Sequence, residues 1–242
     1  MSGTKLRPRE LRDAIEGDGL SLHYLPQVRL ATGTLDGVEA FVRWPHATLG
    51  LVGPGEVADL VREGSLHTAL DRWVIRTACR DLAKWRERGA AVPLVAVSVW
   101  PQTLEEQDGA AAILAAIREA GAEPEQLEIR LPRGFLGHAA VAALAGSKVR
   151  FATDEVPEGA APGVTTLKVR LDTVRKVADR ATVIGAVVAA ARRLGARVVA
   201  DGVETRDQQE ALRGLGVDVA QGYLYSPEIS ADDVAALVVV AR

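Results

Sequence analysis

Charged residues recur at every second position of several short apolar segments, as they would along strands that have one buried face. In the stretch from Gly37 to His46 the apolar side chains Val38, Ala40, Val42 and Trp44 share one face, and Glu39 and Arg43 lie on the other. The same alternation, applied to the other segments, collects candidates for the inner face of a barrel near its mouth: the acids Glu39, Glu128, Asp154 and Asp201, and the bases Arg43, Arg130, Lys168 and Arg170. An acid and a base close together at the mouth of a barrel can do chemistry or bind a ligand.

Two kinds of chemistry are open to such a set. A site for two divalent cations needs an excess of carboxylates, because the metals bring about four positive charges. Four acids against four bases give no excess, so one alternative is a salt-bridge network that lines the barrel. The other is a ligand site, in which Arg and Lys would bind a phosphate group. The histidines have no metal-ligand spacing, and they are His23, His46, His67 and His138.

Strand-like and helical patterns alternate along the chain and predict the elements that must position these side chains. We expect strands at 21–30, 37–46, 93–100, 127–132, 148–155, 165–171, 196–203 and 219–226. We expect a short helix at 7–16 and seven main helices at 54–64, 68–89, 104–120, 134–145, 173–194, from Thr205 onward, and at 231–241. Thr205 and Gln208 have the spacing of a capping box.

This order predicts an α/β fold, a modified (β/α)8 barrel of the TIM type. The connection between the first two strands is short and hairpin-like, which leaves open that one strand is antiparallel. We expect residues 1–19 to be a helical lead-in and residues 20–242 to form one barrel domain.

Composition narrows the classes of function. The chain has 242 residues, 48% of them hydrophobic and 25% charged, with a net charge of -3, which argues against binding DNA or RNA through electrostatics. Its one cysteine, Cys79, allows no internal disulfide. The start of the chain is too polar for a secretory signal, and no apolar run approaches the roughly 20 residues of a membrane span. We therefore expect a cytoplasmic protein with no membrane segment.

Several longer strings occur in a characteristic order: HYLPQV, GVEAFVRWPH, DRWVIRTACRDLAKW, LKV, VVADGVET and QGYLYSPEI. With them the chain resembles the EAL domain family from about Leu20 to about Pro227. The members are bacterial phosphodiesterases that linearise cyclic di-GMP on a modified (β/α)8 barrel.

The resemblance implies roles for individual residues. Metal-ligand positions of the family fall on Glu39, Asp154 and Glu155, and catalytic positions on Lys168, Asp201 and Glu204. Dinucleotide-binding positions fall on Arg43, Lys168, Gln221 and Gly222.

The chain departs from the family pattern at several of these positions. Leu25 replaces a glutamine that contacts the dinucleotide, Ser98 replaces a metal-ligating asparagine, and Arg130 replaces a metal-ligating glutamate. Arg133 and Arg170 also replace acids. A guanidinium beside a dication reverses the local charge, which is worse than the loss of one ligand. The resemblance is therefore to a degenerate member that holds no cofactor, and we expect Arg130 to lie within ion-pair distance of Glu39 or Asp154.

Two functions remain open. The first is a catalytically inactive signalling module that acts through a regulatory protein partner, with or without sensing cyclic di-GMP, and with substitutions around 157–162 expected to disturb the protein complex more than nucleotide binding. The alternative is a weak phosphodiesterase that needs Mg2+ or Mn2+ and uses residues Glu39, Asp154, Lys168, Asp201 and Glu204. The resemblance also leaves open a homodimer.

Overall fold

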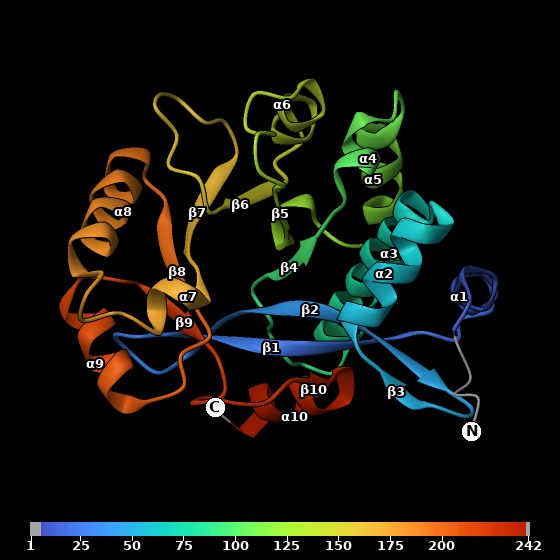
Figure 1. Cartoon of the computed structure of the whole chain (residues 1–242), viewed down its shortest axis with the longest axis horizontal. Helices are drawn as coiled ribbons and strands as arrows, with labels where there is room; N and C mark the ends of the chain where they lie inside the picture. The colour runs from blue at the N-terminus through green and yellow to red at the C-terminus, as the bar shows by residue number, and fades with distance from the viewer. Residues whose placement is uncertain (1–5, 241–242) are drawn as a thin grey trace.

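Eight strands close into a barrel in the computed structural model, which describes residues 6–240 (Figure 1). They are β1 (Ser21–Arg29), β2 (Leu35–His46), β4 (Val95–Ser98), β5 (Leu127–Arg130), β6 (Arg150–Thr153), β7 (Val164–Val169), β8 (Arg197–Asp201) and β9 (Val219–Gln221). Strand β1 pairs antiparallel with both β2 and β9, and the other pairings within the barrel are parallel. The predicted barrel with one reversed strand is confirmed.

Strand β1 contains Pro26, which has no amide hydrogen for a sheet ladder. Pro26 pairs with Val38 of β2, and the register shifts directly afterwards, between Gln27 and Val28. Such a shift lets a strand bend, so β1 can use its second half to reach β9 and close the barrel.

Two strands lie outside the barrel and were not predicted. Strand β3 (Gly50–Val52) folds back on the end of β2 as a hairpin, and β10 (Ile229–Ser230) pairs with β1. They have three and two residues, too few to show an alternating pattern.

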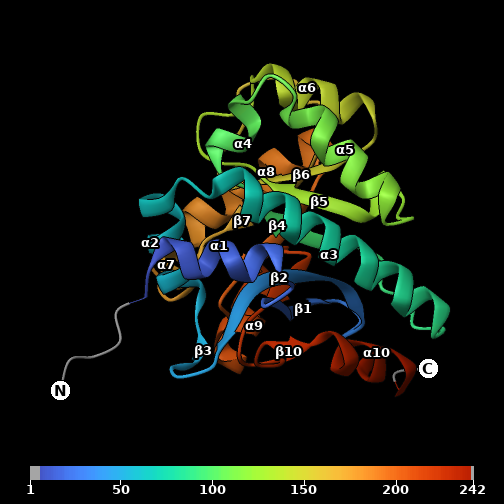
Figure 2. The same ribbon diagram turned by 90° about the vertical axis from the view of Figure 1, so that its right-hand side faces the viewer.

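The helices lie around the outside of the barrel (Figures 1 and 2). They are α1 (Pro8–Glu16), α2 (Pro54–Gly64), α3 (His67–Glu87), α4 (Pro101–Glu105), α5 (Gly109–Glu119), α6 (Ala139–Gly146), α7 (Leu171–Val174), α8 (Ala181–Leu194), α9 (Arg206–Gly214) and α10 (Ala231–Val240). The predicted capping box is present at α9, where the Thr205 side chain accepts from the Gln208 amide and the Gln208 side chain accepts from the Thr205 amide.

Three predicted helices were wrong in extent. The helix at 104–120 is divided into α4 and α5, because Glu106 is extended and the chain folds so tightly that a Cβ on Gly109 would lie 2.0 Å from the Thr103 carbonyl oxygen. The helix at 173–194 is divided into α7 and α8, since none of the residues 175–180 is buried and a helix there would have no apolar stripe to pack. The helix at 134–145 begins only at Ala139.

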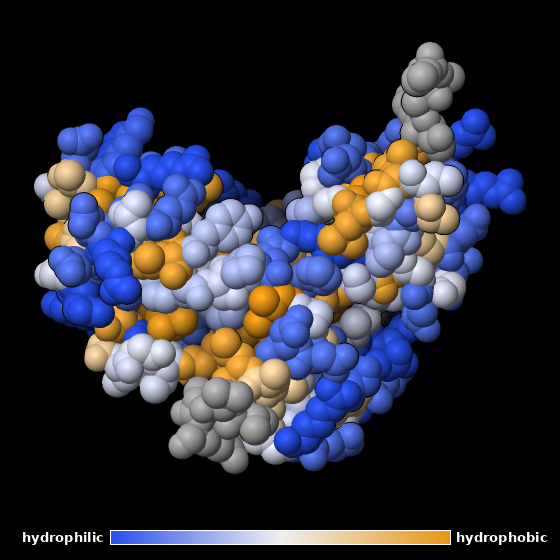
Figure 3. Space-filling model, turned by 90° about the horizontal axis from the view of Figure 1, so that it is seen from below, coloured by the Kyte–Doolittle hydropathy of each residue, from blue (hydrophilic) through white to orange (hydrophobic). Residues whose placement is uncertain are grey.

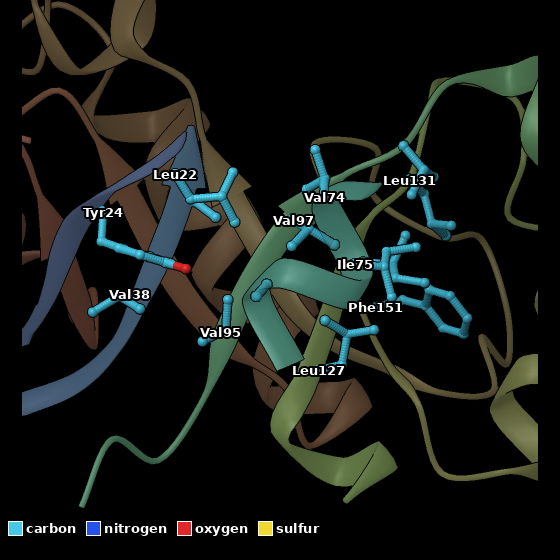
Figure 4. Close-up of a cluster of buried hydrophobic side chains, with 14 of the residues drawn as sticks. Leu22, Tyr24, Val38, Val74, Ile75, Val95, Val97, Leu127, Leu131 and Phe151 are labelled. Atoms are coloured by element: carbon cyan, nitrogen blue, oxygen red, sulfur yellow. The ribbon is translucent and has the colours of Figure 1, made fainter. Parts of the chain in front are cut away.

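The core fills the space between the barrel wall and α3 (Figure 4). From the strands come Val95, Leu127 and Phe151, and from α3 comes Ile75, all 0% exposed. Tyr24 of β1 is hydrogen-bonded to the same helix: its hydroxyl donates to Asp81 Oδ2 at 2.7 Å.

Helix α1 packs through the buried Leu11, as expected of a lead-in helix. The division into residues 1–19 and 20–242 stays a prediction. Residues 1–5, 241 and 242 lie outside the part of the chain that the structure describes.

None of the helices between residues 6 and 240 is long and apolar enough to cross a membrane.

Candidate functional site

Three predicted residues meet inside the barrel at its mouth, by which we mean the carboxyl end of the parallel strands. The Lys168 ammonium from β7 lies 2.8 Å from Glu39 Oε2 of β2 and 3.0 Å from Asp201 Oδ1 of β8. Gln221, at the end of β9, donates its side-chain amide to the same Glu39 oxygen. Because Glu39 and Lys168 are 2% and 4% exposed, these contacts are shielded from solvent.

Arg130 completes this group, which we call the mouth cluster: Glu39, Lys168, Asp201, Arg130 and Gln221. Its guanidinium Nη1 lies 3.9 Å from Glu39 Oε1 and 3.8 Å from Asp201 Oδ2. The predicted ion pair between Arg130 and Glu39 is confirmed. Two acids and two bases leave the mouth cluster with no formal charge.

Burial and ion pairing act in opposite directions on these groups. Burial alone would raise the pKa of Glu39, but the charges of Lys168 and Arg130 lower it overall. Burial raises the pKa of Asp201, and the nearby Glu39 charge adds to this effect. For Lys168, burial disfavours the ammonium, yet Asp201 and Glu39 raise its pKa. The two nearby carboxylates therefore favour the charged form of Lys168.

Glu128 was predicted at the mouth, and this was wrong. Its side chain points into the barrel one layer deeper, where it accepts from the Thr166 hydroxyl at 2.6 Å and from Arg197 at 3.3 Å. Arg197 opens β8, so the pair lies toward the amino ends of the parallel strands. Since the period of two selects a face but not a depth, alternation could not separate Glu128 from Arg130.

A line of hydrogen bonds connects this deeper layer to the mouth cluster. Arg197 donates to Gln27 Oε1 at 3.3 Å, and Gln27 donates to Gln221 Oε1 at 2.9 Å. Gln221 in turn donates to Glu39. The Arg197 guanidinium can only donate hydrogen bonds and the Glu39 carboxylate can only accept them. The side-chain amides of Gln27 and Gln221 between them therefore each have one favourable orientation of oxygen and nitrogen. We call this line the amide relay.

Gln27 and Arg197 were not among the predicted site residues. Gln27 lies two residues after Leu25, and Arg197 lies four residues before Asp201. Each pair therefore shares one face of its strand. The same alternation, extended along each strand away from the mouth, would have found both.

Asp154 belongs to a separate, outer cluster. Its carboxylate lies 3.4 Å from Arg133 and 3.6 Å from Arg170. Arg170 was expected inside the barrel, but it precedes α7, its side chain is 47% exposed, and it also pairs with Asp172 at 3.0 Å. Glu155 accepts the Gly134 amide at 2.9 Å. Asp154 and Glu155, two of the three predicted metal positions, thus form no ion pair within the mouth cluster, although Asp154 and Lys168 line the same pocket.

The remaining predicted residues, Arg43, Glu204 and Gly222, make their contacts with residues outside the mouth cluster. Arg43 forms its ion pair with Glu228, and Glu204 pairs with Arg175 at 3.0 Å. Gly222 follows Gln221 with a φ of +147°, and a Cβ there would lie 2.4 Å from backbone atoms of Val203. Gly222 therefore allows the end of β9 to pack directly on the neighbouring turn.

The mouth cluster is a poor fit for divalent cations. A metal would have to share Glu39 and Asp201 with two positive side chains, one of them within 3.0 Å of both. Arg130 approaches the oxygens that Lys168 leaves free. Within residues 6–240, no three His, Cys, Asp or Glu side chains are grouped so that they could hold a metal ion.

Comparison with known proteins identifies the family to which the chain belongs. The family described as "EAL domain" matches residues 8–228. This chain belongs to the EAL domain family. Its fold is shared with solved EAL structures. One of them is a complex titled "PaMucR Phosphodiesterase, c-di-GMP complex", which is 29% identical, with 93% of this chain and 98% of that chain covered and a TM-score of 0.83.

Two curated EAL relatives come from Pseudomonas aeruginosa. The bifunctional diguanylate cyclase/cyclic di-GMP phosphodiesterase MucR is 29% identical over 95% of this chain and 36% of its own length. The cyclic di-GMP phosphodiesterase NbdA is 31% identical over 90% of this chain and 30% of its own length. The chain therefore spans about a third of the length of these relatives.

Proposed function

We propose that this EAL domain is a catalytically inactive signalling module that acts through contact with a regulatory protein partner. The observation that carries the proposal is the mouth cluster, in which Arg130 and Lys168 neutralise Glu39 and Asp201. In the family pattern, Glu39 is a metal-ligand position and Asp201 a catalytic one, so a phosphodiesterase would need both carboxylates free of such pairing.

The physical reason is electrostatic. Hydrolysis with two metals requires ions that activate water and stabilise the leaving oxygen. Arg130 adds a positive charge where the family pattern has a carboxylate, so a dication would meet repulsion as well as one ligand fewer. The side chain of Ser98 is also shorter than the amide that the family has at that position.

Exposed apolar side chains support a protein partner. Val156, in the loop before β7, and Val183 of α8 are 45% and 47% exposed. Both line a shallow groove of about 650 Å³ beside α8. This loop runs on into residues 157–162, where we still expect substitutions to affect a protein complex more than nucleotide binding.

A second candidate is a receptor that binds cyclic di-GMP without cleaving it. Lys168, Gln221 and Gly222 keep the family pattern, and the 29% identical MucR structure is titled as a complex with this dinucleotide. Against it, Arg43 is engaged by Glu228 and Leu25 cannot replace the glutamine contact.

Hydrolysis assays with Mg2+ and with Mn2+ test the loss of catalysis. We expect no linear product from cyclic di-GMP above that of a Glu39→Ala control. Metal-dependent product that Glu39→Ala abolishes would overturn the proposal in favour of a weak phosphodiesterase. An Arg130→Glu variant shows whether this one side chain is the main obstacle to metal binding.

Calorimetry with cyclic di-GMP, with and without Mg2+, tests the receptor candidate. Sub-micromolar binding that is lost in Arg43→Ala would make the domain a cyclic di-GMP receptor. No binding would leave contact with a protein as its function.

A further inference from the structure

A groove lies between α2 and the hairpin formed by β2 and β3, on the side of the molecule where the described chain begins (Figure 2). Its volume is about 430 Å³. We call it the hairpin groove, and its lining residues are Leu6, Leu49, Leu51, Val52, Glu56, Asp59, Leu60 and Glu63.

One side of the hairpin groove is apolar and accessible. Leu49 and Leu51, on the hairpin, are 44% and 56% exposed, and Val52 and Leu60 form a buried base. Figure 3 shows apolar residues gathered beside the start of the described chain, with hydrophilic residues around them. Leu49 and Leu51 thus stay exposed beside the buried Val52 and Leu60. An exposed apolar patch of this kind indicates a surface that another molecule covers.

The other side of the hairpin groove is acidic. Glu56, Asp59 and Glu63 are exposed on one face of α2, because they are three and seven residues apart along the helix. Asp59 pairs with Arg62, but neither Glu56 nor Glu63 has an ion-pair partner among residues 6–240. The wall thus presents uncompensated negative charge over two helical turns, about 10 Å.

We propose that the hairpin groove is the docking site for a basic amphipathic helix of a partner protein. The apolar side chains of such a helix would cover Leu49 and Leu51, and its Lys or Arg residues would lie along Glu56, Asp59 and Glu63. A helix fits because its charged residues recur with the same three-to-four-residue spacing as the acids of α2. The inference rests on the proposed function only in that the occupant is a protein partner.

A synthetic peptide tests this directly. The probe is a fluorescent 18-residue helix of Leu, Lys and Ala with its leucines on one face, and fluorescence anisotropy measures its binding to the full chain at low and at moderate salt. We expect Leu49→Ser with Leu51→Ser to weaken binding at least about tenfold, because two apolar contacts are lost. Glu56→Gln with Glu63→Gln should weaken it roughly fivefold at low salt and flatten the salt dependence.

Matched controls separate the groove from general attraction to an acidic protein. A Leu171→Ser, Leu237→Ser variant removes an equal number of exposed leucines elsewhere and should bind the probe as the wild type does. A peptide of the same composition with its leucines scattered should bind at least about tenfold more weakly, since it has no apolar face. Equal binding of both peptides, or no effect of the groove variants, overturns the proposal.

Two other occupants give different results. If sedimentation shows a dimer that Leu49→Ser with Leu51→Ser converts to a monomer, the occupant is a second copy of the chain. If removal of residues 1–5 strengthens probe binding severalfold, those residues are the occupant. Either result overturns the proposal, whereas turnover of cyclic di-GMP would overturn only the proposed function.

Discussion

Lys168 neutralises two carboxylates at once, Glu39 and Asp201. Without Lys168, the two negative charges would repel each other. In Lys168→Met, Glu39 and Asp201 would face each other in the barrel with only the more distant Arg130 between them. Removing one partner of a buried ion pair commonly costs about 3–5 kcal/mol, and we expect a loss of this size in the free energy of unfolding, measured with urea.

Two further variants identify the cause of that loss. Adding Glu39→Gln to Lys168→Met should recover part of the stability, because one of the unpaired charges is removed. Arg170→Met, in an exposed pair, should change stability by less than about 1 kcal/mol. If Lys168→Met costs no more than Arg170→Met, the mouth cluster does not depend on this ion pair.

Asp71 of α3 gives the protein a predictable pH dependence. Burial raises its pKa to about 7, although the Trp100 amide and the Thr103 hydroxyl donate to its carboxylate at 2.7 and 2.6 Å and favour the charged form. The folded state therefore holds a proton that the unfolded state has lost between about pH 4 and pH 7. The stability from this group is complete below pH 4 and disappears as the pH rises through about 7.

Asp71→Asn isolates this effect, because the asparagine carbonyl can accept the same two hydrogen bonds without a charge. We expect the variant to match the wild type near pH 4 and to become the more stable protein by pH 8, by up to roughly 4 kcal/mol. Urea unfolding at a series of pH values measures the difference. A difference that does not change with pH would mean that Asp71 is ionised in the folded protein throughout.

At the scale of elements, Gly222 sets how closely the end of β9 packs on the turn after β8. We expect Gly222→Ala to destabilise the protein by more than about 2 kcal/mol, because the new Cβ would meet the Val203 backbone and the glycine conformation would become strained. Thermal unfolding measures this. Gly185→Ala is the matched control, since open space surrounds Gly185 within α8, and it should stabilise the helix by about 0.5–1 kcal/mol.

The barrel could be predicted because most of its strands are long enough to show alternating apolar and polar residues, and its helices have apolar stripes. Such patterns predicted α2 with its observed ends and the capping box at Thr205. They failed where the deciding contact is tertiary: the close packing at Gly109 divides a helix, and β3 forms only because β2 is there to pair with it.

The candidate site was predicted in part, for the same reason. Period-two alternation identified Glu39, Arg130, Lys168 and Asp201 as inward-facing, and they do meet. It could not give the depth of Glu128 in the barrel. Nor could it show that Arg43 would be engaged by Glu228, which is 185 residues away along the chain.

At the scale of the whole molecule, the amide relay should couple two residues that do not touch. Arg197 orients Gln27, and Gln27 orients Gln221, so Arg197→Met and Gln221→Leu should be non-additive in the free energy of unfolding by at least about 0.5 kcal/mol. In a Gln27→Leu background the same two substitutions should be additive. Urea unfolding of these variants measures both couplings, and a coupling that persists without Gln27 would contradict the relay.

The reversed strand β1 also has a consequence for the order of folding. It lies between β2, which follows it directly, and β9, whose Gln221 is 194 residues from Gln27. A chain emerging from the ribosome can pair β1 with β2 early, but the other edge of β1 stays open until β9 has been made. Contacts this distant along the chain form slowly, and open strand edges are prone to aggregation. We therefore expect the buried amide pair of Gln27 and Gln221 to be among the last native contacts to form during synthesis.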